Sequence, residues 1–243
     1  MTILEICAGG IEDCINAQVA GANRIELNSA LHLGGLSPSL AVLTQAVKKI
    51  EIPIICMVRP RGAGFCYNEL EKEVMFEDAK IFLEAGAKGL AFGFLTPEGN
   101  MDWDATKKMI ELCKTYNADS VVHRAFDCVK NPEETLETLI ELGCTRILTS
   151  GQGKNIMSGL ENLAKWQKQY GKQIEFLGGC GVSLANLTEI LEKTGLEQLH
   201  GSFKSWVEDP TTTNGEVSYR YSDSGDYDLC HLESMKEAVN ILK

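Results

Sequence analysis

Short apolar runs alternate with amphipathic stretches along the whole chain. The runs are four to six residues long and rich in apolar and β-branched side chains, which is typical of buried strands. We predict eight strands, at residues 3–7, 24–27, 53–58, 89–94, 119–124, 146–149, 174–178 and 198–202. Because a helix-like stretch follows each run, the pattern predicts a repeated strand–helix unit.

The stretches between the runs carry helix start and stop signals. In residues 38–50 the apolar side chains recur at intervals of three and four, as on one face of a helix. In residues 131–143, Asn131 is a good N-cap, Pro132 suits the first helical position, and Gly143 ends the helix. A glycine-containing turn precedes three of the runs, in AGANRIEL (20–27), AGAKGLAF (85–92) and LGCTRILT (142–149). We expect each of these glycines to take the left-handed conformation that terminates a helix.

Eight strand–helix units in about 250 residues predict a TIM (β/α)8 barrel, an α/β fold, as a single domain over residues 1–243. A doubly wound open sheet is the alternative. That fold usually shows a G-x-G-x-x-G motif after its first strand, which ICAGGIED (6–13) lacks. Residues 203–230 contain a proline, three threonines and an SDSGDYD stretch, so we expect a long irregular segment before a last helix at 231–242. Since this segment follows the eighth strand, it should lie on the face where barrel enzymes bind ligands.

Side chains along a strand point alternately to its two faces, and one face of each barrel strand meets the helices. In RIEL the apolar Ile25 and Leu27 must face the helices, so Arg24, Glu26 and the following Asn28 point into the barrel. The same alternation directs further side chains inward: Glu5 and Cys7, Met57 and Arg59, Val121 and His123. Unpaired buried charges cost several kcal/mol each, so these groups must pair with one another or bind a ligand.

Polar residues also gather where the predicted strands end. The strand in VVHRAFD (121–127) delivers His123 to the barrel mouth, with Asp127 placed to orient or charge-balance it. Our candidate catalytic residues are Glu5, Glu26, Arg59, His123 and Asp127. Arg61 and the glycine-rich loops after the last three strands suit an anion, to which Lys204 could add charge. The candidate anion-binding residues are Arg61, Ser150, Gly151, Gly179, Gly181, Gly201 and Ser202.

Composition narrows the classes of partner. A net charge of −11 argues against nucleic acid and anionic membranes, which both require basic surface. No stretch reaches the ~18 apolar residues of a membrane span, and the N-terminal MTILEICAGG does not resemble a signal peptide. We therefore expect a soluble cytoplasmic protein. The nine cysteines occur singly without any C-x-x-C pair, which predicts reduced thiols rather than a zinc ribbon or a thioredoxin-like motif.

Eight short blocks along the chain resemble, in order, the signature blocks of the CutC family, the so-called copper homeostasis proteins. They are LEIC (4–7), ANRIELN (22–28), GGLSPS (34–39), MVRPRGAGF (57–65), FGFLTPEG (92–99), HRAFD (123–127), ILTSGQ (147–152) and GGCGV (178–182). The resemblance extends to about residue 202. It implies a TIM barrel, a cytoplasmic location, a role in copper homeostasis, and a homo-oligomer that is a dimer or a tetramer.

The resemblance also implies a metal ligand. In some members copper(I) binding is attributed to cysteines, and one of them matches Cys7 here. Its partner would follow the RIEL block, where this chain has Asn28. Because copper(I) prefers two or more soft ligands, a second one has to come from elsewhere. Four further cysteines lie near predicted strand ends: Cys56, Cys66, Cys128 and Cys180.

Three functions are consistent with these observations. The first is a protein of copper homeostasis that binds copper(I) through Cys7. The second is a metabolic enzyme acting on a small anionic or phosphorylated substrate at the barrel mouth, where the carboxylates and His123 provide acid–base groups or hold a hard divalent metal. Arg59 and Arg61 would then hold the anion. The third is a scaffolding barrel whose inner charges merely plug its interior.

Overall fold

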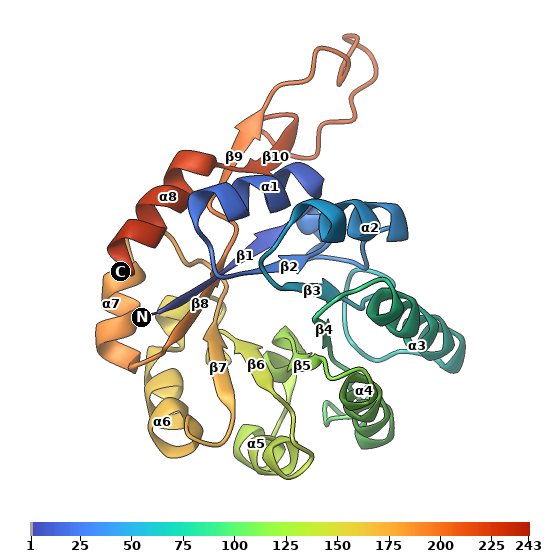
Figure 1. Ribbon diagram of the computed structural model, residues 1–243, viewed down its shortest axis with the longest axis vertical. Coiled ribbons are helices and arrows are strands. Elements are labelled where there is room, and N and C mark those ends of the chain that lie inside the picture. The colour runs from blue at the N-terminus through green and yellow to red at the C-terminus, as the bar shows by residue number, and fades with distance from the viewer. Residues whose placement is uncertain (1) are drawn as a thin grey trace.

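The computed structural model describes residues 2–243 and forms a closed barrel of eight parallel strands inside a ring of helices (Figure 1). The strands pair in chain order, and β1 closes the barrel against β8. Their bounds are β1 Ile3–Ala8, β2 Arg24–Leu27, β3 Ile54–Met57, β4 Gly89–Phe92, β5 Asp119–Val122, β6 Arg146–Thr149, β7 Glu175–Gly178 and β8 Gln198–Gly201. The predicted single-domain TIM barrel is confirmed.

Eight α-helices follow the strands in turn. They are α1 Ile11–Ala20, α2 Leu40–Lys49, α3 Glu69–Glu84, α4 Trp103–Thr115, α5 Pro132–Glu141, α6 Leu160–Tyr170, α7 Leu187–Thr194 and α8 Leu232–Ile241. Three short 3₁₀ helices lie in the loops: η1 Leu31–Leu33, η2 Arg124–Cys128 and η3 Ile156–Ser158.

The predicted helix ends are largely confirmed. Gly21, Gly86 and Gly143 all have positive φ, at 87°, 105° and 69°. Pro132 is the first residue of α5. Asn131 occupies the N-cap position but its side chain makes no capping bond, and its Nδ2 instead donates to Glu134 Oε2 at 3.3 Å.

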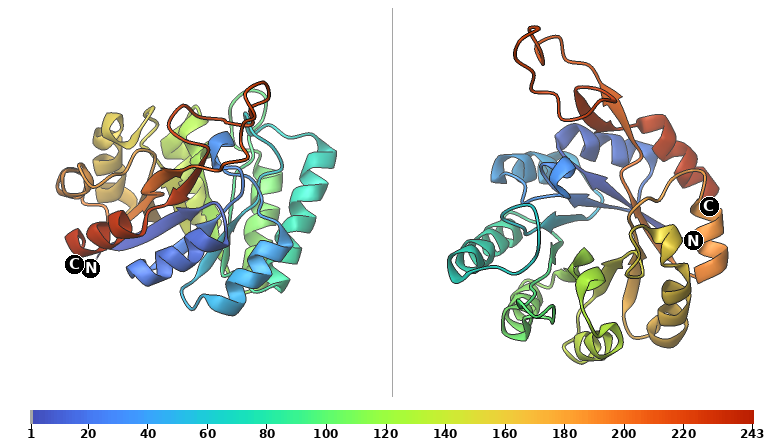
Figure 2. Two further views of the ribbon diagram at one scale, coloured as in Figure 1. Left: turned by 90° about the horizontal axis from the view of Figure 1, so that it is seen from above. Right: turned by 180° about the vertical axis from the view of Figure 1, so that it is seen from behind.

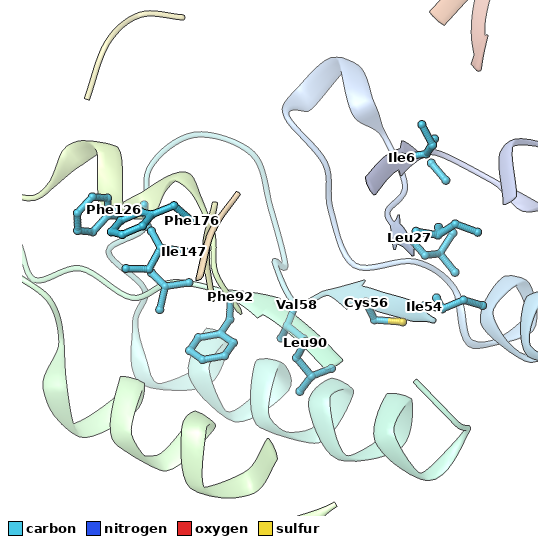
Figure 3. Close-up of a cluster of buried hydrophobic side chains, with 14 of the residues drawn as sticks. Ile6, Leu27, Ile54, Cys56, Val58, Leu90, Phe92, Phe126, Ile147 and Phe176 are labelled. Carbon is cyan, nitrogen blue, oxygen red and sulfur yellow. The ribbon is translucent and has the colours of Figure 1, made fainter. Parts of the chain in front are cut away.

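The apolar core has two parts. The larger part fills the space between the strands and the helices and includes the outward-facing Ile6, Leu27, Phe92 and Phe176 (Figure 3). The smaller part lies inside the barrel and consists of Ile55, Met57, Ala91, Val121, Leu148 and Leu177. These six residues all belong to β3–β7. The interior next to β1, β2 and β8 is therefore left to polar side chains.

The segment after β8 differs from the prediction of irregular structure. It begins and ends as an antiparallel ribbon of β9 (Lys204–Val207) and β10 (Tyr227–Cys230). The loop between these strands projects beyond the ring of helices (Figures 1 and 2). Tyr221 of this loop stacks on His32 of η1, with ring centroids 4.5 Å apart. The ribbon leads the chain from β8 to α8, which packs against α1.

Candidate functional site

A pocket of about 530 Å³, lined by several charged side chains, lies at the carboxyl ends of the barrel strands. Its lining includes seven of the candidate catalytic, anion-binding and metal-binding residues, namely Cys7, Glu26, Arg59, His123, Gly181, Gly201 and Ser202. Glu26 comes from β2 and His123 directly follows β5, so distant strands contribute to one cavity. The prediction that inward-pointing polar side chains converge is confirmed.

The floor of the pocket carries three groups able to bind a metal. One ligand atom each from Cys7, Glu26 and His200 lie within 4.8 Å of one another. Glu26 Oε2 is 3.9 Å from Cys7 Sγ and 3.8 Å from His200 Nε2. Asn28 Nδ2 donates to Glu26 Oε2 at 2.9 Å and lies 3.6 Å from Cys7 Sγ. The floor thus combines one sulfur, one nitrogen and one oxygen donor.

Glu5 does not line the pocket but lies one layer below its floor. Its Oε1 is 2.8 Å from His200 Nδ1, and its Oε2 accepts from Arg24 Nε. Arg24 Nη2 also donates to Gln198 Oε1 at 2.7 Å. This lower layer is a buried, paired charge network, so the plug interpretation describes Glu5 and Arg24 but not the residues above them.

Burial and pairing give these groups different protonation. Burial opposes the charge on Glu5, but its bond with His200 and the charge of Arg24 lower its pKa to about 2. Burial also opposes a charge on His200, but Glu26, Cys7 and Glu5 outweigh it and raise its pKa well above 6.5. Burial raises the pKa of Glu26 and that of the Cys7 thiol. At neutral pH the pocket floor therefore contains an imidazolium held by a carboxylate, next to a thiol.

Arg59 and His123 form part of the pocket wall, and both are buried. The Phe65 ring lies beside both, 5.1 Å from the Arg59 Cζ and 5.0 Å from the His123 ring centroid. Burial, with the charge of Arg59, lowers the pKa of His123 to about 3. His123 is thus a neutral imidazole at physiological pH.

Asp127, Ser150 and Gly151 were expected at the site, but none of them lines the pocket. Asp127 forms no hydrogen bond with His123 in residues 2–243. Its Oδ1 instead accepts from Thr149 Oγ1 at 2.5 Å and from the amides of Ser150 and Gln152 at 3.1 Å. The Asp127 carboxylate therefore holds the loop after β6 and occupies amides of that loop that an anion would need.

Arg61 and Gly179 also lie outside the pocket lining. Arg61 is half-exposed and pairs with Glu71 of α3, so it cannot act with Arg59 on one ligand in this arrangement. Gly179 donates its amide to Thr149 O at 3.0 Å, and an added Cβ would lie 2.6 Å from Leu148 Cδ1. Its role is to leave room for Leu148 inside the barrel.

The most informative residue that the sequence analysis missed is His200. In QLHG (198–201) the apolar Leu199 faces the helices, so alternation alone would have placed Gln198 and His200 inside the barrel. Phe65 and Arg124 line the pocket as well and were also missed, whereas Cys180 and the rim residue Lys204, both named from the sequence, do line it. Among the other cysteines considered as ligands, Cys56 is buried in the outer core, and Cys66 and Cys128 are exposed outside the pocket lining.

Fold and site together define the protein as a single-domain TIM barrel whose candidate site lies at the carboxyl ends of the strands, where barrel proteins bind their ligands. In the described chain, no helix is both long and apolar enough to cross a membrane.

Sequence comparison then identifies the family. The CutC family model matches residues 2–205, and the chain belongs to the CutC family. It is 40% identical over 243 residues to a protein named CutC from Treponema denticola, covering 98% of both chains. It is 38% identical over 203 residues to the human copper homeostasis protein cutC homolog, covering 84% of this chain and 74% of the human one.

A solved structure agrees with this assignment. The crystal structure of CutC from Streptococcus agalactiae superimposes with a TM-score of 0.78 at 30% sequence identity. The superposition covers 83% of this chain and 99% of that one.

Proposed function

We propose that the protein takes part in copper homeostasis in the cytoplasm by holding copper(I) between Cys7 Sγ and His200 Nε2. The observation that carries this proposal is the group of ligand atoms from Cys7, Glu26 and His200 within 4.8 Å of one another. Thiolate and imidazole are both ligands that copper(I) accepts. The name of the human relative supports the copper role.

The surroundings of His200 fit a metal ligand. A ligating histidine usually donates its other ring N–H to a carboxylate, which fixes the ring and its tautomer. Glu5 Oε1, 2.8 Å from His200 Nδ1, is in that position and leaves Nε2 facing Cys7 and Glu26. His200 thereby supplies the second ligand that Asn28 does not.

Anaerobic titration with copper(I) against a competing chelator tests the proposal. We expect one equivalent to bind, with affinity at least tenfold weaker in Cys7→Ser and in His200→Gln. Cys180→Ser is the matched control, because Cys180 lines the pocket outside the three-ligand group and should leave the affinity unchanged. An unchanged affinity in Cys7→Ser would eliminate a thiolate site.

Proton competition gives a second readout of the same site. Copper(I) must displace the protons that the raised pKa values keep on His200 and Cys7. Since these protons are released on binding, affinity should increase with pH between 6 and 8. If the copper(I) affinity did not change with pH, the metal would bind at other residues.

An enzyme acting on a small anionic or phosphorylated substrate is the second candidate. It is favoured by the pocket volume, within the ~300–1,000 Å³ of small-molecule sites, and by Glu26 and His200 as an acid–base pair with raised pKa values. Screening phosphorylated and carboxylated metabolites by NMR for conversion tests it. We expect turnover in the wild type and none in Glu26→Gln, and equal turnover in both would refute this assignment of Glu26.

We also propose a cellular location and an oligomeric state. The nine free cysteines support a reducing compartment such as the cytoplasm, which cell fractionation would test. A homo-oligomer, either a dimer or a tetramer, is implied by the family resemblance. Sedimentation velocity would distinguish these from a monomer.

A further inference from the structure

Arg59 is a buried cation without a carboxylate partner. The chain has six arginines, and within residues 2–243 the other five each form an ion pair. Arg59 is 6% exposed and forms none. A buried charge is costly unless something compensates it, so the pocket wall favours a negatively charged group.

The contacts of Arg59 orient its guanidinium without neutralising it. Nη1 donates to the carbonyls of Leu33 and Gly35 at 3.1 and 3.0 Å, and Nη2 donates to Ala63 O at 2.7 Å. Nε is buried and has no hydrogen-bond partner within residues 2–243. A Cβ on Gly34, whose φ is +88°, would lie 3.0 Å from Nη1, so the loop closely surrounds the guanidinium. The carbonyls are neutral, and the positive charge persists.

His123 provides a second unpartnered donor. Its Nδ1 accepts the Ala125 amide at 3.1 Å, so in the neutral ring the hydrogen is on Nε2. Nε2 is buried and has no partner among the described residues. A buried unpaired N–H is costly, and such a group needs a specific explanation.

Both groups belong to one wall of the pocket. The Phe65 ring lies about equally far from the Arg59 guanidinium and the His123 ring, and all three residues line the cavity. The other cations at the pocket already have partners. Arg124 pairs with Asp127 at 2.8 Å and Lys204 with Asp228 at 2.9 Å.

We propose that Arg59 and His123 form a subsite for one oxyanion, a carboxylate or a phosphate, of a small ligand whose other end reaches Glu26 and His200 on the pocket floor. This inference rests on the second candidate function and names its substrate class. A carboxylate or phosphate accepts hydrogen bonds from guanidinium and imidazole N–H groups and supplies the missing negative charge.

Binding to the metal-free wild type is the first test. Inorganic phosphate and formate are compared with chloride at equal ionic strength, by thermal shift and by calorimetry. We expect phosphate or formate, but not chloride, to stabilise the protein, and the better of the two identifies the oxyanion. In imidazole ¹H–¹⁵N spectra the His123 Nε2–H signal should shift on binding. No stabilisation beyond chloride, or an unmoved His123 signal, would overturn the subsite.

Two variants and two matched controls locate the anion. Arg59→Lys keeps the charge but removes the planar fork, and His123→Asn can keep the bond to the Ala125 amide while removing Nε2–H. Each should weaken binding at least tenfold. Arg61→Gln, outside the pocket, and Lys204→Gln, at the rim, should leave it within about twofold. Loss only in Lys204→Gln would place the anion at the rim and refute the proposal.

These measurements separate the inference from both candidate functions. Anion binding is measured without metal and without turnover, and copper(I) binding in a buffer without oxyanions. If phosphate or formate binds but no metabolite is converted, the oxyanion subsite is supported and the enzyme function is refuted. If a substrate is converted and binds to Arg59→Lys and His123→Asn with wild-type affinity, the enzyme function is supported and the oxyanion subsite is refuted.

Discussion

The two histidines of the pocket, His123 and His200, have opposite protonation because different groups pack against them. His200 lies between the carboxylates of Glu5 and Glu26, which hold its proton although the ring is buried. His123 is buried beside Arg59 with no carboxylate, so its proton is lost. One pocket thus contains an imidazolium and a neutral imidazole, which is a common arrangement where acid and base roles are divided.

His123 should make the protein less stable in mild acid. Its pKa is about 3 in the folded state against 6.5 ordinarily, so the unfolded chain binds the extra proton as the pH falls below 6.5. Between pH 6.5 and 4.5 this linkage costs about 2 kcal/mol of unfolding free energy. His123→Asn removes that component, and urea unfolding at the two pH values measures it. His231→Asn, on the exposed N-cap of α8, is the control and should keep the wild-type difference.

Glu5 should stabilise the fold through its charge. Its pKa of about 2 lies below the ordinary 4.5, so its contribution is complete above pH 4.5 and is lost as the pH falls towards 2. Glu5→Gln leaves Arg24 unpaired and should cost about 3–5 kcal/mol at pH 7. The pKa of His200, followed by NMR, should fall in the same variant. Glu175→Gln is the control, because Arg146 keeps Asp119 and little stability should be lost.

Residue-level prediction succeeded on the strands and for the one or two extended residues after them, and it failed farther into the loops. Alternation correctly turned Glu26, Arg59 and His123 towards the interior because apolar neighbours must face the helices. The rule fails where the backbone is no longer extended. Asp127 lies in η2, where side-chain direction depends on 3₁₀ geometry and on contacts with the loop after β6.

At the scale of elements, the strands were predicted to within two residues at each end, whereas the structure of the loops was not predicted. The apolar runs are bounded by glycine and polar residues that mark strand ends locally. Loop structure depends on distant partners, as when Tyr221 stacks on His32 or Arg59 binds the carbonyl of Leu33. The hydrophobic periodicity of the sequence does not indicate such contacts. The ribbon β9–β10 was missed for this reason.

Gly93, directly after β4, should be required for the position of His123. An added Cβ would lie 2.6 Å from the Ala125 Cβ and 2.7 Å from His123 Cε1, closer than packed carbon atoms allow. Gly93→Ala should therefore cost about 1–3 kcal/mol in urea unfolding and shift the His123 imidazole signal. Gly10→Ala is the control, because nothing lies within 4 Å of its added Cβ. Equal effects of the two substitutions would contradict the packing argument.

At the scale of the whole molecule, the site exists because the barrel closes. Glu5 and His200 are 195 residues apart and meet only where β1 pairs with β8. The repeat pattern predicts eight units and therefore closure, but it does not state which inward side chains then become neighbours. The apolar interior of β3–β7 occupies one side, and the charged groups of β1, β2 and β8 occupy the other.

Closure also depends on the last helix, although the family model ends at residue 205. Met235 and Ala238 of α8 are fully buried, and the Cys230 amide donates to Asp13 Oδ1 of α1 at 2.7 Å. The projecting loop between β9 and β10 is mostly exposed. The barrel should therefore need α8 but not this loop.

Two shortened chains test this division of roles. Val207 pairs with Tyr227, so replacing residues 208–226 by Asn-Gly joins β9 and β10 in a two-residue hairpin. This variant should fold and unfold cooperatively, within about 1–2 kcal/mol of the full chain, because it loses mainly the contacts of Tyr221 with His32, Trp206 and Asp228. A chain ending at Val207 exposes the apolar faces of α1 and α7 that pack against α8 and should show no cooperative transition by circular dichroism. If the truncated chain folded as well as the hairpin variant, α8 would have no part in closing the barrel.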